Sequence, residues 1–306
     1  MSSKRAALRF ELGGRPFPLP IVRGTVAGES AWMVIDTGAN SHILASWLAR
    51  KAGLALRPRP VPASDHAGRA VSTYSVTRPA VAIEGWGPLN DAAMLVTDVP
   101  EAVAAMGIGA FLSPQWLASL PDGLVLDLRG GEMRTAPWTE AVAELGRGGG
   151  LALGSLPPAG SEDSHDSRSG GRQAGGICVA GTPTIPELSY VLPARVGGHP
   201  VDLLLDTGSS RTDLLTTSDA ARTLARRAHP SKEPIYAASG LVDTLSIGGL
   251  EISVGAWSAK MDVDLVAVPS GGARTACPRD GVLGMDALVR CVLVLGRNAM
   301  AGWCEP

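Results

Sequence analysis

Asp36–Ala39 reads Asp-Thr-Gly-Ala and Asp206–Ser209 reads Asp-Thr-Gly-Ser, so the 306-residue chain carries the same tripeptide once in each half. Each copy directly follows an apolar run, Trp32–Ile35 in the first half and Leu203–Leu205 in the second. A Gly lies eight positions before each Asp, where a tight turn could join two strands. Each motif is therefore predicted to stand at the end of a β-hairpin.

A second landmark follows each motif at nearly the same distance. Ala110–Ser113 ends 77 residues after Asp36, and Gly281–Gly284 ends 78 residues after Asp206. Both segments are followed by a short helix-like stretch and then by an apolar strand. Agreement at several landmarks indicates an internal duplication, and so two lobes of similar structure.

The segments between these landmarks are predicted to be mostly β. Short apolar runs alternate with turn residues, and the 38 Gly and 23 Pro fit a turn-rich fold. Helix is predicted only for short segments such as Ile43–Ala52 and Thr216–Arg227. The predicted fold class is therefore all-β with minor helix, in two homologous lobes.

The predicted domains are residues 1–140 for the first lobe, 141–184 for a linker and 185–306 for the second lobe. The linker prediction rests on Gly146–Gly176, which is rich in Gly, Pro and Ser and poor in large apolar residues. The alternative is that this stretch is a long surface loop of the second lobe.

Two Asp-Thr-Gly motifs, one in each lobe, point to hydrolysis by a pair of carboxyl groups. Two carboxylates held close together resist joint ionisation and share one proton, so one can act as a base while the other acts as an acid. Gly permits a tight backbone turn beside the carboxylate. Thr supplies a hydroxyl that can hydrogen-bond across the lobe interface.

The two motifs resemble the signatures of the retropepsin-like and pepsin-like aspartic peptidases. The first is similar to the viral and bacterial retropepsin form, and the second, with Ser209 and Ser210, is closer to the pepsin form. Val282–Gly284 resembles the family's segment that threads behind the catalytic loop. The resemblance covers residues 20–135 and 190–300. It implies an all-β fold of two closed β-barrel lobes with a catalytic cleft between them. It also implies an aspartic-type endopeptidase that needs no metal and no cofactor.

The resemblance also implies roles for individual residues. It makes Asp36 and Asp206 the catalytic pair, and Thr37 and Thr207 interlocking threonines beneath them. It further implies a hairpin flap near His66–Tyr74 in the first lobe and a counterpart at Ala237–Val242 in the second. The remaining residues that it assigns are Gly38, Gly208 and Ser209 as supports of the pair, and Gly68, Tyr74 and Gly240 as substrate-binding residues of the hairpins.

The sequence departs from the family pattern at two positions of the first lobe. Ser113 replaces the Gly of the later motif, and Ala39 lacks the hydroxyl that Ser209 has. In pepsin-like pairs that hydroxyl bonds a carboxylate oxygen, and a hydrogen bond to the charged form favours it. We therefore predict that Asp206 carries the charge more often than Asp36, and that Ala39→Ser shifts the acidic limb of activity downwards.

The four cysteines, Cys178, Cys277, Cys291 and Cys304, all lie in the second half of the chain. They form no CxxC pair, which argues against zinc or thioredoxin-like chemistry. The even count within one lobe favours two disulfides, with four free thiols as the alternative. The pairing that we predict is Cys277–Cys291 and Cys178–Cys304, and paired cysteines would favour a compartment outside the cytoplasm.

Composition limits the partners. The net charge is −2, which gives no general electrostatic reason to bind nucleic acid or an anionic membrane. No apolar run reaches the length of a spanning helix, and no signal peptide is recognisable at the N-terminus. The expected partner is a peptide or unfolded protein, and a monomer is expected because one chain carries both motifs.

Two other functions remain open from the sequence. The first is a protein of the same fold that has lost turnover and only binds peptides. The second is a sugar-kinase or actin-like phosphotransferase, because Asp206–Arg211 resembles a phosphate loop of those enzymes. That second interpretation leaves Asp36 unexplained. The five histidines are scattered without ligand spacing, and His42 is expected to be a structural neighbour of the Asp36 loop.

Overall fold

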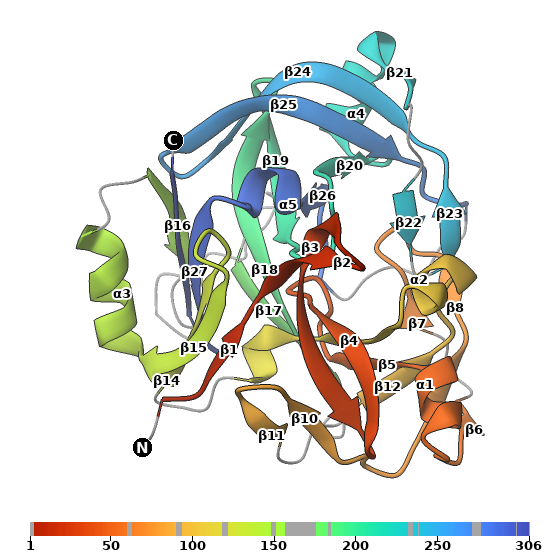
Figure 1. Cartoon of the computed structure of the whole chain (residues 1–306). Helices are drawn as coiled ribbons and strands as arrows, with labels where there is room; N and C mark the ends of the chain where they lie inside the picture. The colour runs from red at the N-terminus through yellow and green to blue at the C-terminus, as the bar shows by residue number, and fades with distance from the viewer. Residues whose placement is uncertain are drawn as a thin grey trace.

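The computed structural model describes residues 3–59, 63–89, 94–117, 122–147, 151–156, 176–182, 185–231, 235–237, 239–270, 277–297 and 299–305. It is mostly β and has two lobes, as the sequence predicts, with a third sheet that joins them (Figure 1). The short helices are α1 (Ser46–Lys51), α2 (Glu101–Ala105), α3 (Trp138–Arg147), α4 (Asp219–Leu224) and α5 (Met285–Leu288), with 3-10 turns η1 (Pro114–Trp116) and η3 (Ala225–Arg227).

The first lobe is built on a ten-stranded sheet. In hydrogen-bonded order its path is β11 (Gly87–Leu89), β10 (Val81–Ile83), β3 (Arg15–Val26), β4 (Glu29–Ile35), β13 (Ile108–Leu112), β5 (His42–Ala45), β12 (Met94–Thr97), β9 (Thr73–Ser75) and β6 (Arg57–Pro58), while β2 (Arg9–Leu12) pairs with β3. Strand β13 runs parallel to β4 and antiparallel to β5. This arrangement places the Ala110–Ser113 landmark directly beside the strand that leads to Asp36.

The second lobe repeats this arrangement in an eight-stranded sheet. Its order is β17 (Gly176–Thr182), β18 (Ile185–Val196), β19 (His199–Leu205), β26 (Gly281–Leu283), β20 (Asp213–Leu215), β25 (Trp257–Val266), β24 (Leu245–Val254) and β21 (His229–Pro230). Strand β26 again runs parallel to one neighbour, β19, and antiparallel to the other, β20. An additional pairing between β18 and β24 closes six of these strands into a barrel.

The same turn leads to both motifs. Ala27 and Gly28 join β3 to β4 with positive φ angles of 48° and 90°. Gly197 and Gly198 join β18 to β19 with φ angles of 55° and 83°. Two consecutive positive φ angles define the turn whose twist matches that of the flanking strands. The duplicated Gly of the sequence therefore marks a duplicated hairpin.

A third sheet joins the two halves of the chain. Its order is β1 (Arg5–Ala7), β15 (Glu132–Pro137), β14 (Asp122–Asp127), β27 (Cys291–Leu295), β28 (Met300–Cys304) and β16 (Leu151–Leu156). The seam is the antiparallel pair β14 and β27, in which Leu124 is opposite Leu295. All residues of β27 are buried. Strands β14 and β27, the apolar strands that follow the two landmarks, therefore join the lobes through one shared sheet.

The segment 141–184 is not simply a linker. It contains most of α3 and the whole of β16 and β17, and these strands pair with β28 and β18. Few residues of the whole segment are large and apolar, so its overall composition does not indicate strands. Both strands lie at sheet edges, where they form hydrogen bonds with a strand of an existing sheet. Residues 157–175 of the predicted linker lie outside the described part of the chain.

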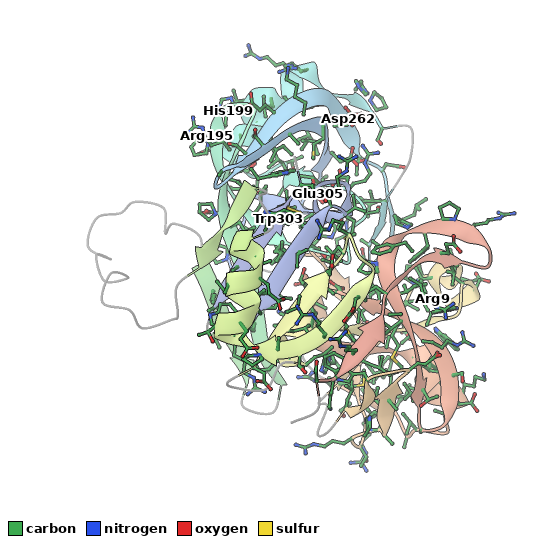
Figure 2. All side chains as sticks on the ribbon, turned by 60° about the vertical axis from the view of Figure 1, so that its left-hand side comes forward. Arg9, Arg195, His199, Asp262, Trp303 and Glu305 are labelled. Carbon is green, nitrogen blue, oxygen red and sulfur yellow. A yellow bond between two sulfur atoms is a disulfide. The ribbon has the colours of Figure 1, made fainter. Side chains whose placement is uncertain are left out.

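The outer surface and the core separate clearly. Charged side chains such as Arg9, Arg195 and Asp262 lie on the outside of the lobes (Figure 2). Trp303 on β28 is buried against Ala141 and near Leu145 of α3. Among the described residues, no helix is long and apolar enough to cross a membrane.

Candidate active site

The two motifs lie at the ends of equivalent strands, β4 and β19. Asp36 and Asp206 each follow the last residue of their strand. The backbone N–H of Asp36 donates to the Leu112 carbonyl at 2.9 Å, and that of Asp206 donates to the Leu283 carbonyl at 3.0 Å. The neighbouring strands β13 and β26 therefore fix both aspartates in the same way.

Thr37 and Thr207 interlock across the lobe interface. The Thr37 hydroxyl accepts from the Thr207 N–H at 2.9 Å and donates to the Leu205 carbonyl at 2.8 Å. The Thr207 hydroxyl accepts from the Thr37 N–H at 3.0 Å and donates to the Ile35 carbonyl at 2.7 Å. Both side chains are fully buried. Four reciprocal hydrogen bonds thus hold the two loops in register.

Gly38 and Gly208 allow the loops to approach each other. A Cβ atom on Gly38 would lie 2.3 Å from Cγ of Asp206, and one on Gly208 would lie 2.3 Å from Cγ of Asp36. Real Cβ contacts are essentially never shorter than 3.0 Å. Each Gly therefore lies directly beside the carboxyl group of the other lobe, and no other residue type fits there without displacing it.

The two carboxyl groups lie in contacting loops and act on each other's ionisation. Burial, followed by the charge of Asp206, raises the pKa of Asp36 well above its ordinary value. Burial also raises the pKa of Asp206, although the charges of His66 and Arg279 act in the opposite direction. Two adjacent carboxyl groups in such surroundings share one proton and titrate jointly.

The contact predicted for Ser209 is wrong. Its hydroxyl donates to the Arg211 carbonyl at 2.8 Å, so its single proton is not directed at Asp206. Backbone N–H groups bind the carboxylates instead. Asp36 accepts from Gly38 and Ala39 at 2.8 and 2.9 Å, whereas Asp206 accepts from Gly208 at 2.9 Å. Any preference for charge on Asp206 must therefore have another source.

Different side chains support the equivalent turns of the two lobes. The Ser113 N–H donates to Nδ1 of buried His42 at 3.1 Å, and the Gly284 N–H donates to the Thr212 hydroxyl at 3.1 Å. Burial lowers the pKa of His42 to about 4, so this imidazole is neutral when it accepts that bond. His42 is thus a structural neighbour of the Asp36 loop, and Ser113 is accommodated despite its side chain.

Gln115 is a support that sequence reasoning missed. Its buried side-chain amide donates to the Ala39 carbonyl at 3.0 Å and to the Leu188 carbonyl at 2.8 Å. It ties the Asp36 loop to the second lobe. Asp286 occupies the equivalent position, two residues after Gly284, and accepts from the Thr212 hydroxyl at 2.7 Å. Both residues lie two positions after their landmark, so the sequence alone could have indicated them. They were missed because Gln and Asp are different residue types and do not look like a repeat.

Two short hairpins meet where the lobes face each other. The first hairpin is β7 (Ala63–Ser64) with β8 (Ala70–Val71), and the second hairpin is β22 (Ile235–Ala237) with β23 (Gly240–Val242). Figure 1 shows them side by side. The Ser239 hydroxyl of the second hairpin donates to Asp65 of the first at 2.5 Å.

Of the three residues predicted to lie in these hairpins, two do and one does not. Gly68 lies in the turn of the first hairpin with φ of 80°, and Gly240 begins β23 with φ of 124°. Tyr74 instead belongs to β9, and its hydroxyl donates to Asp98 at 3.0 Å. That bond raises the pKa of Tyr74. The structure therefore brings Gly68 and Gly240 to the hairpins but places Tyr74 in the first lobe's sheet.

A buried charged cluster, which the sequence did not reveal, lies between the first hairpin and the second lobe. His66 Nε2 in the hairpin turn lies 3.5 Å from Asp213 Oδ2 at the start of β20. The Arg279 guanidinium donates to the His66 carbonyl at 3.2 Å. His66, Asp213 and Arg279 are far apart in the sequence and follow no motif, so only the fold reveals their proximity.

The cysteines form two disulfides, but the predicted pairing is wrong. Cys178 pairs with Cys277, and Cys291 pairs with Cys304. Cys291 and Cys304 are directly opposite each other in the β27–β28 hairpin, which spacing alone could not show. Cys178 lies in β17, within the predicted linker, and ties it to the segment before β26.

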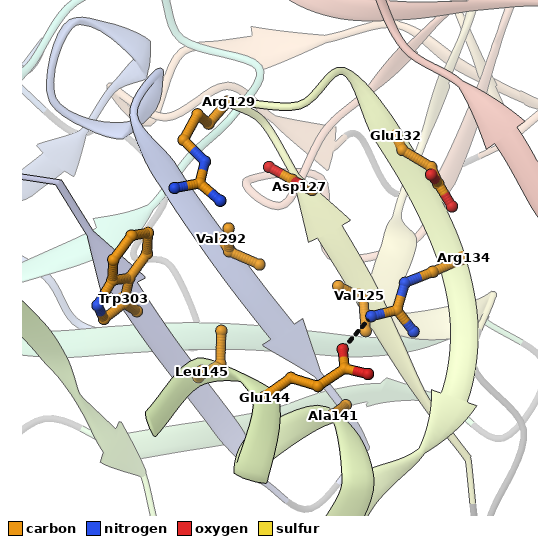
Figure 3. Close-up of a pocket in the computed structure, with 10 residues that line it drawn as sticks. All are labelled: Val125, Asp127, Arg129, Glu132, Arg134, Ala141, Glu144, Leu145, Val292 and Trp303. Atoms are coloured by element: carbon orange, nitrogen blue, oxygen red, sulfur yellow. Dashed lines mark hydrogen bonds and ion pairs between the residues drawn. The ribbon is translucent and has the colours of Figure 1, made fainter. Parts of the chain in front are cut away.

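A cavity of about 160 Å³ lies elsewhere, between α3 and the third sheet (Figure 3). Its charges are matched locally: Arg134 pairs with Glu144, Arg5 pairs with Glu132, and Arg129 pairs with Glu305. It contains no residue of either motif. Among the described residues, no group of three His, Cys, Asp or Glu side chains could hold a metal ion.

The chain has two similar β lobes, and each contributes one aspartate where the two motif loops meet. This arrangement defines a two-lobed protein of the acid protease fold. A family model described as aspartyl protease matches residues 22–124 and 192–287, one region in each lobe. The chain therefore belongs to the aspartyl protease family. No curated protein matches it.

Proposed function

We propose that this protein is an aspartic endopeptidase of the retropepsin and pepsin type, with Asp36 and Asp206 as its catalytic pair. The observation that carries the proposal is the contact of the two motif loops, in which each motif Gly lies directly beside the aspartate that the other lobe contributes. Thr37, Gly38, Thr207 and Gly208 hold the pair in place, while Ser209 supports the Asp206 loop through Arg211.

The chemistry follows from one shared proton. The ionised carboxylate takes a proton from a water molecule, whose oxygen bonds to the carbonyl carbon of the peptide. The protonated carboxyl group gives its proton to the carbonyl oxygen, so that a neutral tetrahedral intermediate forms. This intermediate collapses when the carbon–nitrogen bond breaks and the leaving nitrogen takes up a proton. No bond to the protein forms at any step.

The substrate that we propose is an extended peptide segment of an unfolded protein. The two hairpins contact each other through Ser239 and Asp65, and we propose that the peptide binds beneath them. Exposed strand edges of hairpins bind an extended peptide through its backbone. One chain contributes both aspartates, so we propose that the monomer is the active form. The two disulfides favour an oxidising compartment outside the cytoplasm.

Hydrolysis of an unstructured protein between about pH 3 and about pH 7 tests this function. We expect cleavage by the wild-type protein that a pepstatin-type inhibitor blocks and that Asp206→Asn abolishes. Peptide binding without cleavage would instead support a peptide-binding protein that has lost turnover. The mostly β architecture is not the α/β fold that a sugar-kinase-like phosphotransferase requires.

A further inference from the structure

The segment after each landmark holds a carbonyl group of the neighbouring motif loop, but the two lobes use different donors. In the second lobe, the backbone N–H of Met285 donates to the Ser209 carbonyl at 2.8 Å. The equivalent residue of the first lobe is Pro114, which has no N–H group. The carbonyl of Ala39, which corresponds to that of Ser209, therefore cannot be held by this backbone position.

The hydrogen bonds of the following turn show that these positions are equivalent. The N–H of Trp116 donates to the Ser113 carbonyl at 3.2 Å, and the N–H of Ala287 donates to the Gly284 carbonyl at 3.1 Å. Each bond joins the last residue of a landmark to the residue three positions later. Both segments thus make the same turn, and the residue directly after each landmark occupies the same place in it.

The Gln115 side chain supplies the donor that is missing from the first lobe. Its buried Nε2 donates to the Ala39 carbonyl at 3.0 Å. The same nitrogen donates to the Leu188 carbonyl at 2.8 Å and to the Thr37 carbonyl at 3.4 Å. All three partners are carbonyl oxygens, which can only accept, so the amide must turn its NH₂ group towards them.

These contacts restrain the two backbone N–H groups that bind Asp36. The Thr37 carbonyl and the Gly38 N–H belong to one planar peptide unit, so restraining the carbonyl also aims the N–H. The bond to the Ala39 carbonyl holds the loop on the other side of the Ala39 N–H. Both N–H groups donate to Oδ1 of Asp36, at 2.8 Å from Gly38 and 2.9 Å from Ala39.

The second loop, which a backbone donor holds, has a different arrangement. The N–H of Ser209 donates to the Asp206 carbonyl at 3.3 Å, and not to the carboxylate as the N–H of Ala39 does. A backbone N–H such as that of Met285 holds one peptide unit, whereas an amide NH₂ has two donors and can span several. The side-chain donor therefore accompanies a second N–H bond to the catalytic carboxylate.

We propose that Gln115 is a positioning residue of the carboxyl pair, whose amide supplies the donor that Pro114 lacks and aims two backbone N–H groups at Asp36. This inference rests on the proposed function and gives Gln115 no contact with the substrate or the reacting water. Through Leu188 the same amide ties the Asp36 loop to β18, which leads through its hairpin to the strand that carries Asp206.

The role predicts a change in the ionisation of the pair when the amide is lost. Burial and then the charge of Asp206 raise the pKa of Asp36, while the N–H bonds from Ala39 and Gly38 lower it. Without these bonds, full ionisation of the pair is less favourable, whichever carboxyl group holds the shared proton. The sum of the two apparent pKa values must then rise, so at least one limb of the pH profile moves upwards.

The charged groups around the pair stay the same in such a variant, because Gln115 is neutral. His66 and Arg279 act on Asp206, and both residues are retained. The buried His42, which accepts from the N–H of the residue before Pro114 and has a pKa of about 4, is also retained. A shift relative to wild type at each pH therefore reports the lost hydrogen bonds.

The pH dependence of kcat and KM in Gln115→Met tests the proposal, since Met has a similar length and no N–H donor. We expect at least one limb to move upwards by about 1 pH unit, with kcat reduced and KM near its wild-type value. The matched control is Thr97→Val in β12. It removes a buried hydroxyl that donates to the Ser72 carbonyl at 2.9 Å, and it should leave both limbs in place.

A rescue experiment separates positioning from simple space filling. Pro114→Ala restores a backbone N–H at the place where Met285 donates in the second lobe. Combined with Gln115→Met, it should return the shifted limb part of the way towards its wild-type position. A side chain that only fills space would not be replaced by a backbone N–H, so the double variant would then keep the full shift.

Titration of ¹³C-labelled aspartate carboxyls, assigned with Asp36→Asn and Asp206→Asn, gives a readout that needs no turnover. Gln115→Met should raise the sum of the two apparent pKa values. If it does not fold, Gln115→Asn, which is one methylene shorter, should raise the sum by less. Unmoved limbs with an unchanged sum, or a shift that Pro114→Ala leaves uncorrected, overturn the proposal. A raised sum in a protein whose wild type cleaves no peptide would count against the proposed function alone.

Discussion

At the scale of single residues, the hydroxyl groups of Thr37 and Thr207 hold the two lobes in register. Each accepts an N–H from the opposite loop and donates to a carbonyl at the end of the opposite strand. Removing one hydroxyl leaves a buried N–H and a buried carbonyl unpaired. Each such unpaired group costs roughly 1–3 kcal/mol.

Thr37→Val should therefore lower the free energy of unfolding by about 2–6 kcal/mol. The shape of the side chain is kept, so packing is a minor factor. Thr37→Ser retains the hydroxyl and is the matched control. Denaturant unfolding of both variants measures the difference, and equal stability of Thr37→Val and wild type would contradict the role of this contact.

Gly38→Ala should abolish cleavage, because its Cβ would need the space that the Asp206 carboxyl group occupies. Gly208→Ala should do the same through Asp36. Gly146→Ala is a control, since a Cβ there meets nothing within 4 Å. Full cleavage activity in Gly38→Ala would show that the carboxyl groups are not held as the structure has them.

The sequence was sufficient to find these residues, because Asp, Thr and Gly recur in a fixed order. It was insufficient for the residues that support them. Gln115 and Asp286 occupy equivalent positions with different chemistry. His66, Asp213 and Arg279 meet only through tertiary contacts. Ser209 was misassigned because a hydroxyl that could reach Asp206 instead bonds the nearby Arg211 carbonyl.

At the scale of elements, the neutral His42 imidazole joins β5 to the end of β13. Burial lowers its pKa in the folded protein to about 4, from an ordinary value of 6.5. Between these values the unfolded chain binds more protons than the folded one, so stability rises with pH across that window. The stabilisation is present above about pH 6.5 and is lost as the pH falls through about 4.

His42→Gln should remove this pH dependence, which amounts to about 3 kcal/mol over the window. The Gln oxygen can still accept from the Ser113 N–H. Unfolding at about pH 4 and about pH 7 measures the effect against His199→Gln, whose residue lies at the start of β19. An equal pH slope in wild type and His42→Gln would exclude His42 as the source.

The elements themselves were only partly predictable. The hairpins before each Asp and the strands after each landmark could be predicted from turn residues and apolar runs. The segment Ile43–Ala52 was predicted as helix, yet its first residues belong to β5, because pairing with β12 and β13 overrides local preference. Strands β16 and β17 contain apolar residues but were missed because the sequence between them is rich in Gly, Pro and Ser.

At the scale of the whole molecule, the Cys178–Cys277 disulfide and the third sheet connect segments that are far apart in the chain. Cys178–Cys277 spans 99 residues, whereas Cys291–Cys304 spans 13. A cross-link stabilises mainly by restricting the unfolded chain, and longer loops gain more. Pairing could not be deduced from the sequence, because four cysteines allow three arrangements.

Replacing Cys178 and Cys277 together with Ala should lower the free energy of unfolding by about 5 kcal/mol, and replacing Cys291 and Cys304 by about 3 kcal/mol. Thermal unfolding and mass mapping under non-reducing conditions measure both. A Cys277–Cys291 peptide, or four alkylatable thiols, would contradict the observed pairing.

The central claim is that one aspartate from each lobe is required and that neither suffices alone. Initial rates of hydrolysis of one defined peptide should be compared for wild type, Asp36→Asn and Asp206→Asn, with Asp127→Asn on the third sheet as the control. We predict that Asp36→Asn and Asp206→Asn each lower the rate by about 10²- to 10⁴-fold, while Asp127→Asn keeps the wild-type rate. Cleavage at the wild-type rate by either Asp36→Asn or Asp206→Asn would contradict the shared-proton mechanism.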